Sequence, residues 1–431
     1  MVFCPAIIIS APASGQGKTT LTAALAHHHT QRGKKVQVFK IGPDFLDPKI
    51  LCLASQQAVY NLDLFMLGTE QCCQLLYDAA SQSDLILIEG VMGLYDGNPS
   101  TADCAIEWQI PVLITIDGSA MAQTYGALAL GLSTFKNIPL CGVIANKVNS
   151  AYHAALLKNS LPAHLTWWGN IPNQPQQTIP ERHLGLSQPH DIPDLFNKLQ
   201  HLAAALPTDA TNIPALASFR APSITPPPLL LTSCIIAIAQ DEAFSFIYQA
   251  NIDTLKEMGA ELVFFSPIHD AVLPQCTALW LPGGYPEQYL APLSQNHSMK
   301  SSILKHINAQ KPTLAECGGM LYLTQSLQNK TEKTTLLGIL PAHCTLQSKL
   351  AAIGHQIASL PLGDIKGHTF HYSTMNTELI PQTQAHSPDG RLGEYIYHIG
   401  SVWASYMHFY FASNPVVVAS FFSPEPTCLS R

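Results

Sequence analysis

Charged residues are scarce in this chain, and their distribution excludes several classes of protein. Only 12% of the 431 residues are Asp, Glu, Lys or Arg, the net charge is −7, and no long basic run is present. A basic surface for nucleic-acid binding is therefore not indicated. Long hydrophobic runs are also missing, because no apolar stretch reaches the ~18 residues that a membrane-spanning helix needs. We expect neither a nucleic-acid partner nor a membrane partner.

Paired cysteine spacings are absent as well. The eleven cysteines include no C-x-x-C motif, and their number is odd, so a disulfide framework is not indicated. The first nine residues lack the basic segment of a signal peptide and lead directly into a strand-like run. These features favour reduced thiols and a cytoplasmic protein.

The chain is rich in apolar residues, at 47%, and its 431 residues are too many for one ordinary hydrophobic core. We therefore expect two compact domains. Residues 207–232 are rich in Pro, Ala, Ser and Thr without periodicity, which is typical of a linker. The prediction is a first domain over 1–206, this linker, and a second domain over 233–431. The oligomeric state stays open, with a homodimer as one option.

The first domain is organised around a loop near its start. An apolar run over 6–9 and a helix-favouring stretch over 21–28 flank the loop Ser14-Gly15-Gln16-Gly17-Lys18-Thr19-Thr20. This strand–loop–helix order is that of a phosphate-binding P-loop, whose glycines let backbone N–H groups approach phosphate oxygens. Lys18 is expected to reach the β- and γ-phosphates, and the Thr19 hydroxyl to bind Mg²⁺. Pro12 replaces the first glycine of G-x-x-x-x-G-K-[ST], so the match is incomplete.

Acidic residues follow two predicted strands of the first domain, where α/β sheets place ligand chemistry. Asp44 and Asp47 come after the strand at 36–40, and Glu89 comes directly after the strand at 84–88. The functional interpretation is contact with Mg²⁺ or substrate, and Glu89 fits the Walker B position. The alternative for Asp44 and Asp47 is helix capping in a turn.

Two further polar residues follow strands in the same domain. Asp96 is a second acidic candidate, although a plain Asp-Gly turn is the simpler interpretation. Asn146 follows the strand at 141–145, where its amide can read a base edge or cap the strand end. Strands at 111–116 and 141–145 alternate with helical stretches. This alternation predicts an α/β fold with a doubly wound parallel sheet.

The second domain, also α/β in pattern, contains a candidate cysteine nucleophile. A short apolar strand, a helix-favouring stretch and small residues surround the turn Glu316-Cys317-Gly318-Gly319. Such a nucleophile elbow leaves room for substrate, and the helix N-terminus favours the thiolate of Cys317. The alternative is a buried, inert thiol. Gly283 and Gly284, after another strand, can offer backbone N–H groups as an oxyanion hole.

A cysteine nucleophile needs a base, and a histidine late in the chain is the candidate. His408 lies among strand-like residues near the end of the second domain. His368 and His371 compete for the same role, so the residue pattern alone leaves the choice open.

Together these motifs resemble the cobyrinic acid a,c-diamide synthase family of the cobalamin pathway, over nearly the whole chain. The motifs that carry the resemblance occupy residues 14–20, 39–48, 61–63, 88–97, 180–186, 282–287, 315–320, 367–373 and 404–408. A P-loop alone occurs in many families. A P-loop followed by Glu-Cys-Gly-Gly in one chain is far more specific.

The resemblance implies a two-domain ligase. The first domain would have the ATP-dependent fold of the dethiobiotin-synthetase type, and the second the fold of a class I glutamine amidotransferase. Cys317 would attack the amide of glutamine and release ammonia, with His408 raising its nucleophilicity. ATP would convert the a and c carboxylates of a tetrapyrrole into acyl phosphates, which ammonia displaces.

The expected small-molecule partners are a tetrapyrrole polycarboxylate and L-glutamine, and the expected cofactors are ATP and Mg²⁺. Because ATP and a polycarboxylate repel each other, a metal ion is needed to bring them together. The residues expected at ATP are Ser14, Gly15, Gln16, Gly17, Lys18, Thr19, Thr20 and Asn146. Those expected at Mg²⁺ are Thr19, Asp44 and Glu89. Those expected at the tetrapyrrole are Asp44, Phe45, Leu46, Asp47 and Asp96.

Several residues depart from the family pattern. Tyr410 stands two residues after His408, so the H-x-E arrangement of many class I glutaminases is absent. Thr369 replaces Glu in G-H-E-F-H-Y-S, and Phe45 stands where Tyr is common. The first two departures raise an alternative in which the glutaminase domain is inactive and free ammonia is used. The third leaves the identity of the tetrapyrrole open.

Other functions remain alternatives. Hydrogenobyrinate or nickel-sirohydrochlorin would be amidated by the same machinery. A partitioning or switch ATPase belongs to a different class. Such ATPases commonly carry a second lysine at the position of Ala13 and lack a cysteine elbow domain, so this sequence disfavours them.

Overall fold

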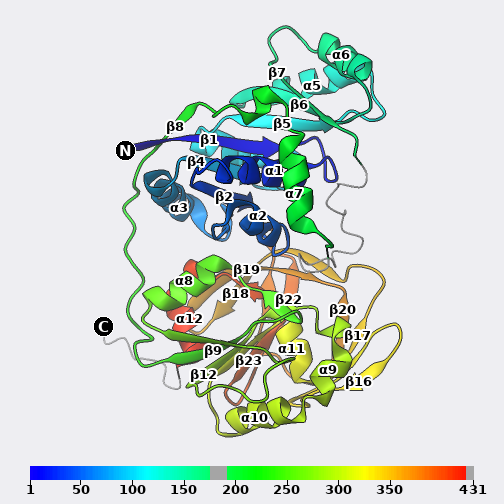
Figure 1. Cartoon of the computed structure of the whole chain (residues 1–431). Helices are drawn as coiled ribbons and strands as arrows, with labels where there is room; N and C mark the ends of the chain where they lie inside the picture. Colours follow the sequence, from blue (N-terminus) through cyan, green and yellow to red (C-terminus); the bar gives the residue numbers. More distant parts are fainter. Residues whose placement is uncertain (175–191, 424–431) are drawn as a thin grey trace. The chain divides into compact units, whose positions relative to one another are not determined.

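The structure is a computed structural model that describes residues 1–174 and 192–423. The chain divides into two compact units, Met1–Ile224 and Thr225–Arg431. Each unit contains its own large sheet with helices packed on it (Figure 1). This arrangement confirms the predicted α/β class.

The first unit is built on an eight-stranded sheet with the order β3-β2-β4-β1-β5-β6-β7. These strands are parallel, and β8 pairs antiparallel with the start of β1. The strands are β1 (Val2–Ser10), β2 (Val36–Ile41), β3 (Tyr60–Leu62), β4 (Leu85–Glu89), β5 (Val112–Asp117), β6 (Leu140–Val148), β7 (Trp167–Pro172) and β8 (Leu216–Phe219). The helices are α1 (Lys18–Thr30), α2 (Asp47–Ser55), α3 (Gly68–Gln82), α4 (Thr101–Trp108), α5 (Thr124–Thr134), α6 (Ala151–Ser160), α7 (Leu195–Ala204) and the short η3 (Thr208–Thr211).

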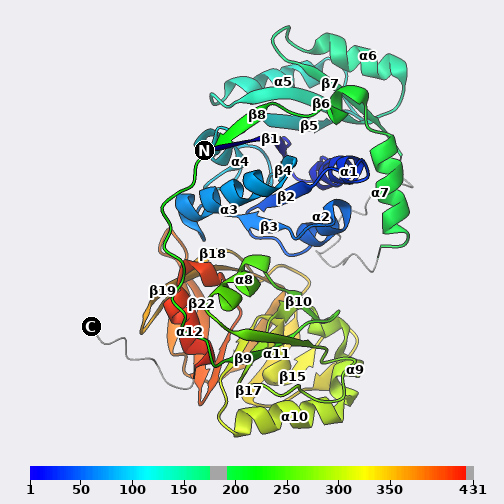
Figure 2. The same cartoon turned by 60° about the vertical axis from the view of Figure 1, so that its left-hand side comes forward.

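Helices cover both faces of this sheet, as the predicted doubly wound fold requires. Helices α1, α2 and α7 pack on one another, and their apolar side chains share a core with β1, β2 and β4. Helix α3 lies on the other side of the strands (Figures 1 and 2). Because both faces are covered, strands such as β4 consist almost entirely of buried apolar residues.

The stretch expected as a linker contains regular structure. Within 207–232, η3 is a short helix, and β8 pairs with β1 from Val2↔Phe219 to Pro5↔Leu216. The sequence did not predict β8, because its partner strand, β1, lies more than 200 residues earlier in the chain. The motif at 180–186 lies outside the described residues.

The second unit is built on a ten-stranded sheet with the order β11-β9-β12-β14-β23-β22-β21-β18-β19-β24. The first five strands of this order are parallel, and the others pair antiparallel. A four-stranded sheet, β16-β15-β17-β20, and the pair β10-β13 complete the strands. The parallel strands carry the predicted elbow, because β14 ends at Glu316.

The strands of the second unit are β9 (Ile235–Ala239), β10 (Phe244–Phe246), β11 (Glu261–Phe265), β12 (Ala278–Leu281), β13 (Gly283–Gly284), β14 (Thr313–Glu316), β15 (Thr324–Gln328), β16 (Lys333–Thr335), β17 (Leu340–Leu346), β18 (Ala352–Leu360), β19 (Gly363–His371), β20 (Ser373–Thr377), β21 (Thr383–His386), β22 (Leu392–Ile399), β23 (Val402–Ser405) and β24 (His408–Phe409). The helices are α8 (Gln249–Glu257), η4 (Pro286–Gln288), α9 (Leu290–Gln295), α10 (His297–Asn308), α11 (Gly318–Leu323), η5 (Phe411–Ser413) and α12 (Pro415–Phe422). Helices α8 and α12 share one core with the sheet, whereas α9, α10 and α11 share another.

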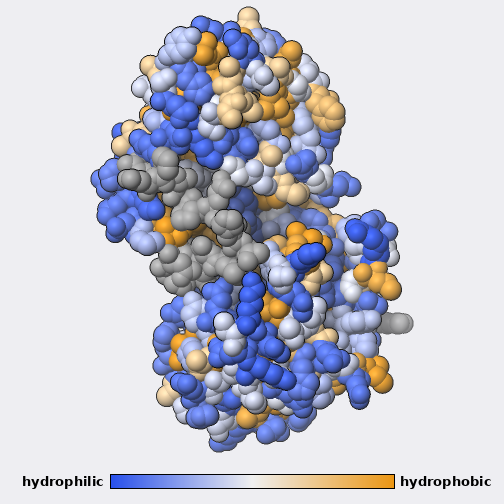
Figure 3. Space-filling view, turned by 90° about the vertical axis from the view of Figure 1, so that its right-hand side faces the viewer, coloured by the Kyte–Doolittle hydropathy of each residue, from blue (hydrophilic) through white to orange (hydrophobic). Residues whose placement is uncertain are grey.

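Within the described residues, none of the helices combines the length and the hydrophobicity needed to cross a membrane. On the face shown in Figure 3, hydrophilic residues cover much of the surface, and hydrophobic residues lie among them in small groups.

Candidate functional site

The P-loop connects the central strand β1 to α1, as the sequence predicts. Gly17 is the N-cap of α1 with φ 93, and a Cβ built on it would lie 2.2 Å from Asn146 Nδ2. Only glycine fits both this backbone conformation and this close contact. Ser14 and Gly15 are exposed, so the loop presents an open concave edge with the N-terminus of α1 behind it.

Two side chains tie this loop to neighbouring strands. Asn146, on β6, donates from Nδ2 to the Gln16 carbonyl at 3.0 Å, and its Oδ1 accepts from the Lys147 N–H at 2.9 Å. The Asp117 N–H, at the end of β5, donates to Gln16 Oε1 at 2.8 Å. In this structure the Asn146 amide therefore holds the loop, and base reading by Asn146 stays a prediction.

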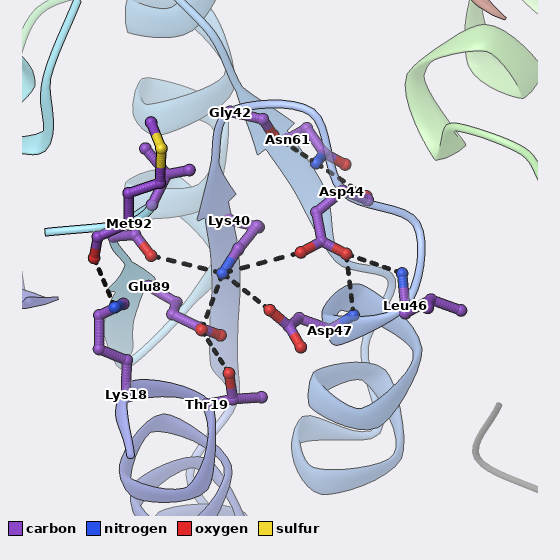
Figure 4. Close-up of polar contacts among 12 residues, drawn as sticks. Lys18, Thr19, Lys40, Gly42, Asp44, Leu46, Asp47, Asn61, Glu89 and Met92 are labelled. Atoms are coloured by element: carbon purple, nitrogen blue, oxygen red, sulfur yellow. Dashed lines mark hydrogen bonds and ion pairs between the residues drawn. The ribbon is translucent and has the colours of Figure 1, made fainter. Parts of the chain in front are cut away.

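Lys18 and Thr19 project from the start of α1 toward the ends of the other strands. Lys18 Nζ donates to the Ala13 carbonyl at 3.0 Å and to the Met92 carbonyl at 2.5 Å (Figure 4). Burial and the neighbouring Lys40 lower the pKa of Lys18 to about 8. The Thr19 hydroxyl donates to Glu89 Oε1 at 2.6 Å. The Walker A and Walker B positions of the sequence are thus side by side.

Lys40 is the centre of an acidic cluster that the sequence reasoning missed. Its Nζ lies 2.8 Å from Glu89 Oε1, 2.9 Å from Asp47 Oδ2 and 4.0 Å from Asp44 Oδ2 (Figure 4). The three carboxylates keep the pKa of Lys40 above its ordinary value despite its burial. A lysine at the end of an apolar strand, shortly before the first of these acids, was the available signal.

Glu89 is fully buried, and burial raises its pKa to about 7, with Lys40 opposing that rise. Its Oε2 has no hydrogen-bond partner in the part of the chain that the structure describes. A buried carboxylate oxygen beside a threonine hydroxyl fits Mg²⁺, which takes few protein ligands and keeps water or phosphate oxygens. Among the described residues, no cluster of three or more His, Cys, Asp or Glu could hold a metal by itself.

The other acids expected at ligands have structural contacts. Asp44 Oδ1 accepts from the backbone N–H groups of Leu46 and Asp47, at 2.8 and 3.1 Å, and so forms the turn into α2. Asp44 is therefore a turn-forming residue, although the N-cap of α2 is Leu46, and the Asp44 side chain faces Lys40 as well. Phe45 is half-buried and Leu46 is buried. Asp96 is exposed, and its Oδ2 accepts from the Gly93 N–H at 3.0 Å, as a turn residue would.

In the second unit, Cys317 occupies the predicted turn between β14 and α11. Its backbone has φ 44 and ψ −105, a conformation that non-glycine residues rarely adopt, and its N–H donates to the Ser405 carbonyl at 2.7 Å. A Cβ built on Gly319 would lie 1.9 Å from the Leu281 carbonyl oxygen. The close packing of α11 on β12 therefore requires glycine at position 319.

The thiol of Cys317 differs from the expectation of a helix-stabilised thiolate. Burial raises the pKa of Cys317 above its ordinary value, and the carboxylates of Glu287 and Glu394 raise it further. Helix α11 has only six residues, so its dipole is too weak to offset burial. A thiol whose pKa is raised needs a base to become a nucleophile.

His408 stays the candidate for that base. It lies on β24, and a Cβ built on Gly283 would come within 2.2 Å of His408 Cε1. A Cβ on Gly318 would lie 2.9 Å from the Gly284 nitrogen. The Gly283–Gly284 strand therefore runs between the histidine and the elbow. Burial, with a contribution from His371, lowers the pKa of His408 to about 3, which favours the neutral ring over the imidazolium.

The two competing histidines are engaged elsewhere. His371 directs Nδ1 to the Ser373 carbonyl and Nε2 to Glu394 Oε1, both at 2.8 Å. His368 lies 3.1 Å from the Tyr248 hydroxyl through Nδ1 and stacks on His408, with ring centroids 5.0 Å apart. The geometry thus favours His408 over both.

The departures at positions 369 and 410 also have a structural setting. The Thr369 hydroxyl donates to Glu394 Oε1 at 2.9 Å, so a carboxylate from β22 lies beside the residue that departs from the family pattern. Tyr410 is buried, and its ring centroid lies 5.1 Å from that of Tyr248. The sequence reasoning missed Glu394, because β22 and β19 are separate strands that do not pair with each other, so no local pattern indicates its contacts with His371 and Thr369.

Comparison with known proteins identifies both units. Residues 7–184 match the model of the CobQ/CobB/MinD/ParA nucleotide binding domain, and residues 235–416 match that of the CobB/CobQ-like glutamine amidotransferase domain. The chain is 49% identical to the hydrogenobyrinate a,c-diamide synthase of Stutzerimonas stutzeri (strain A1501), over 98% of this chain and 99% of that protein.

Two further relatives agree along nearly their whole length. The hydrogenobyrinate a,c-diamide synthase of Pseudomonas aeruginosa is 48% identical over 98% of each chain. The cobyrinate a,c-diamide synthase of Herminiimonas arsenicoxydans is 44% identical over 97% of each chain. The order of the two matched domains is the one expected from the motifs. The chain belongs to the family of cobyrinate and hydrogenobyrinate a,c-diamide synthases.

Proposed function

We propose that this protein uses ATP and glutamine to amidate the a and c carboxylates of a cobyrinate-type tetrapyrrole. The observation that carries the proposal is the presence, in one chain, of a P-loop hydrogen-bonded to Glu89 and of a strained cysteine elbow packed against the Gly283–Gly284 strand, which in turn contacts His408. Relatives named for this reaction match the chain across both units.

The second unit would supply ammonia. His408 takes the proton of the Cys317 thiol as the sulfur attacks the carboxamide carbon of glutamine. Backbone N–H groups of Gly283 and Gly284 would stabilise the oxyanion that forms. The nitrogen leaves as ammonia with the proton from the histidine, and water then cleaves the thioester to give glutamate and the free thiol.

The first unit would activate the carboxylate. A carboxylate oxygen of the tetrapyrrole attacks the γ-phosphorus of ATP, which gives an acyl phosphate and ADP. Ammonia then attacks the acyl carbon, phosphate leaves, and an amide and one proton remain. Lys18 and the backbone N–H groups of the loop would bind the phosphates.

The residues that would hold Mg²⁺ are Thr19 and Glu89, whose oxygens lie together at 2.6 Å. Bound there, the ion would neutralise charge on the phosphates as the carboxylate approaches. The positive charge of Lys40 partly neutralises the surrounding carboxylates, and Asp44 and Asp47 face it from the start of α2. Metal binding by Asp44, and substrate contact by the segment Asp44-Phe45-Leu46-Asp47 and by Asp96, belong to this proposal.

Two rings are the leading substrates. Cobyrinate is the substrate expected from the resemblance, whereas the relatives at 49% and 48% identity are named for hydrogenobyrinate. We propose cobyrinate with hydrogenobyrinate as the alternative, and nickel-sirohydrochlorin as a third. A switch ATPase is disfavoured, because the second unit matches a glutamine amidotransferase domain.

The test is to incubate the protein with Mg²⁺, ATP and each ring in turn, using glutamine or ammonium as the nitrogen source, and to identify products by mass. Diamide from both nitrogen sources supports the proposal, and Lys18→Ala should then lose both. Diamide from ammonium alone would point to an inactive second unit. No amide from any ring would overturn the proposed reaction.

A cytoplasmic location and a homodimer are further parts of the proposal. The ten cysteines among the described residues are free thiols, which suits a reducing compartment. Analytical ultracentrifugation would test the homodimer.

A further inference from the structure

The residue before the nucleophile, Glu316, is buried at the junction of three strands. It is the last residue of β14, and its exposed fraction is 2%. Strand β12 lies beside β14, with Trp280 opposite Leu314. Trp280 and Glu316 therefore lie on the same face of the sheet, since side chains two residues apart share a face.

Both carboxylate oxygens of Glu316 accept a hydrogen bond from another strand. The indole N–H of Trp280 donates to Oε2 at 2.7 Å, and the backbone N–H of Phe409 donates to Oε1 at 2.7 Å. Trp280 and Phe409 are themselves buried. When Glu316 is ionised, both bonds are charge-assisted, and such hydrogen bonds are shorter and stronger than neutral ones. Together they form a bracket between the two strands.

Each of these contacts ends next to one part of the glutaminase site. Phe409 directly follows His408, and both belong to β24, an edge strand of only two residues. Trp280 lies on the strand that leads to Gly283 and Gly284. Glu316 itself directly precedes Cys317. Its carboxylate is therefore connected to all three parts of the proposed site: the nucleophile, the base and the oxyanion glycines.

The backbone of β24 is held from both sides. Asn251, on α8, donates from Nδ2 to the Phe409 carbonyl at 2.9 Å and accepts from the Phe411 N–H at 2.8 Å. Glu316 holds the N–H of the same residue, Phe409. The histidine strand is thus fixed against the elbow by side chains rather than by a long ladder of strand pairing.

Burying the carboxylate of Glu316 at this position is energetically unfavourable. Burial raises the pKa of Glu316 to about 8, although the bonds from Phe409 and Trp280 lower it. An apolar side chain would avoid the desolvation penalty of a buried charge. A requirement for the position of β24 would explain why an acid occupies the site.

We propose that Glu316 is a positioning residue that sets the distance and direction of His408 relative to Cys317 by bracketing Trp280 and Phe409. The inference rests on the proposed function, in which these two residues act as base and nucleophile. This chain carries Tyr410, not a carboxylate, two residues after His408, so the H-x-E arrangement cannot orient the imidazole ring. In our proposal Glu316 instead fixes the backbone of the strand that carries His408.

The test compares Glu316→Gln with wild type and with Glu261→Gln, the same change at an exposed glutamate of the same unit. The amide that replaces the Glu316 carboxylate presents one acceptor and one donor, so the variant loses one of the two bonds. We expect kcat for glutamine hydrolysis to fall about 10- to 100-fold, because misplacing a catalytic group by about 1 Å costs on that order. KM for glutamine, ammonium-dependent diamide synthesis and the behaviour of Glu261→Gln should stay at wild-type levels.

The pH profile separates positioning from a loss of folding. Below about pH 8 a protonated Glu316 is a poorer acceptor. Wild-type kcat should therefore rise as the pH passes that value, and this rise should be missing in Glu316→Gln. If Glu316→Gln does not fold, Trp280→Phe replaces it, since this change removes one donor and keeps an aromatic ring. A several-fold fall in kcat at constant KM supports the bracket.

Three results would overturn the inference. An unchanged kcat in Glu316→Gln, or in Trp280→Phe where it replaces that variant, removes the positioning role. An equal loss of glutamine- and ammonium-dependent synthesis, matched by a lower melting temperature, reduces Glu316 to a stabilising residue. If Cys317→Ala keeps glutaminase activity at the wild-type level, the proposed function itself is overturned. This control therefore distinguishes a failure of the proposed function from a failure of the inference about Glu316.

Discussion

Lys40 Nζ lies 2.8 Å from Glu89 Oε1, and both side chains are almost completely buried. The pair joins β2 to the neighbouring β4 at the edge of the sheet where the P-loop lies. Thr19 donates to the same oxygen of Glu89. The ion pair therefore links the stability of the first unit to the position of the carboxylate beside the phosphate site.

Replacing Lys40 by Met should destabilise the first unit. Removing one member of a buried ion pair leaves the other charge uncompensated, which typically costs about 3–5 kcal/mol. The measurement is urea unfolding of the transition that Mg·ATP protects, since that transition belongs to the nucleotide-binding unit. Lys34→Met, at an exposed lysine, is the matched control and should change little. Equal stability of the two variants would show that the cluster is solvated.

Mg²⁺ binding should depend on pH through Glu89. Burial raises the pKa of this carboxyl from 4.5 to about 7, so it becomes protonated as the pH falls through 7 and can then no longer bind a cation. We expect the Mg²⁺ affinity of the ATP complex to fall as the pH is lowered from about 8 to about 6, by up to roughly tenfold per unit below about pH 7. Calorimetric titration of Mg²⁺ into the complex measures this.

The control for that experiment is Glu89→Gln. In this variant the ATP phosphates still take up protons as the pH falls, but the carboxylate at position 89 is absent. Its weaker affinity should vary less with pH than that of wild type. Parallel curves for the two proteins would argue against Glu89 as a ligand.

Cys317→Ala should abolish glutamine-dependent synthesis and preserve synthesis from ammonium. The thiol is the proposed nucleophile, whereas ammonium bypasses the second unit. Product masses from both nitrogen sources provide the measurement. Cys234→Ala, at another free thiol of the same unit, should retain both activities. Glutamine use by Cys317→Ala would require a different nucleophile.

Gly319→Ala should disable the elbow. The added Cβ would lie 1.9 Å from the Leu281 carbonyl oxygen, so α11 must move and displace Cys317. We expect loss of glutaminase activity of about 100-fold or more, on the order that a displaced catalytic group costs. Gly131→Ala, in α5, meets open space and should stabilise the protein by about 0.5–1 kcal/mol. Normal glutaminase activity in Gly319→Ala would mean that α11 relaxes without moving the thiol.

The local motifs were readable from the sequence because their structure depends on neighbouring residues. The P-loop is a strand, a loop and a helix in immediate succession, and the structure has β1 and α1 at those positions. The turn at Cys317 follows the same logic, since a short apolar strand and two glycines leave few other arrangements.

Contacts between distant residues could not be read in this way. Lys40 meets Glu89 only because β2 and β4 are neighbours, an order that the sequence pattern does not specify. Glu316 reaches Phe409 across 93 positions of the chain, and Glu394 reaches His371 across antiparallel strands. The raised pKa of Cys317 could not be predicted either, because burial depends on the complete fold.

The pairing of β8 with β1 has a consequence for synthesis on the ribosome. Residues Val2 to Pro5 are synthesised more than 200 residues before their antiparallel partners, Leu216 to Phe219. The sheet of this unit can therefore be completed only after translation has passed residue 219. Until then the beginning of β1 presents unpaired backbone groups, and the nascent nucleotide-binding unit remains open at the end opposite its P-loop.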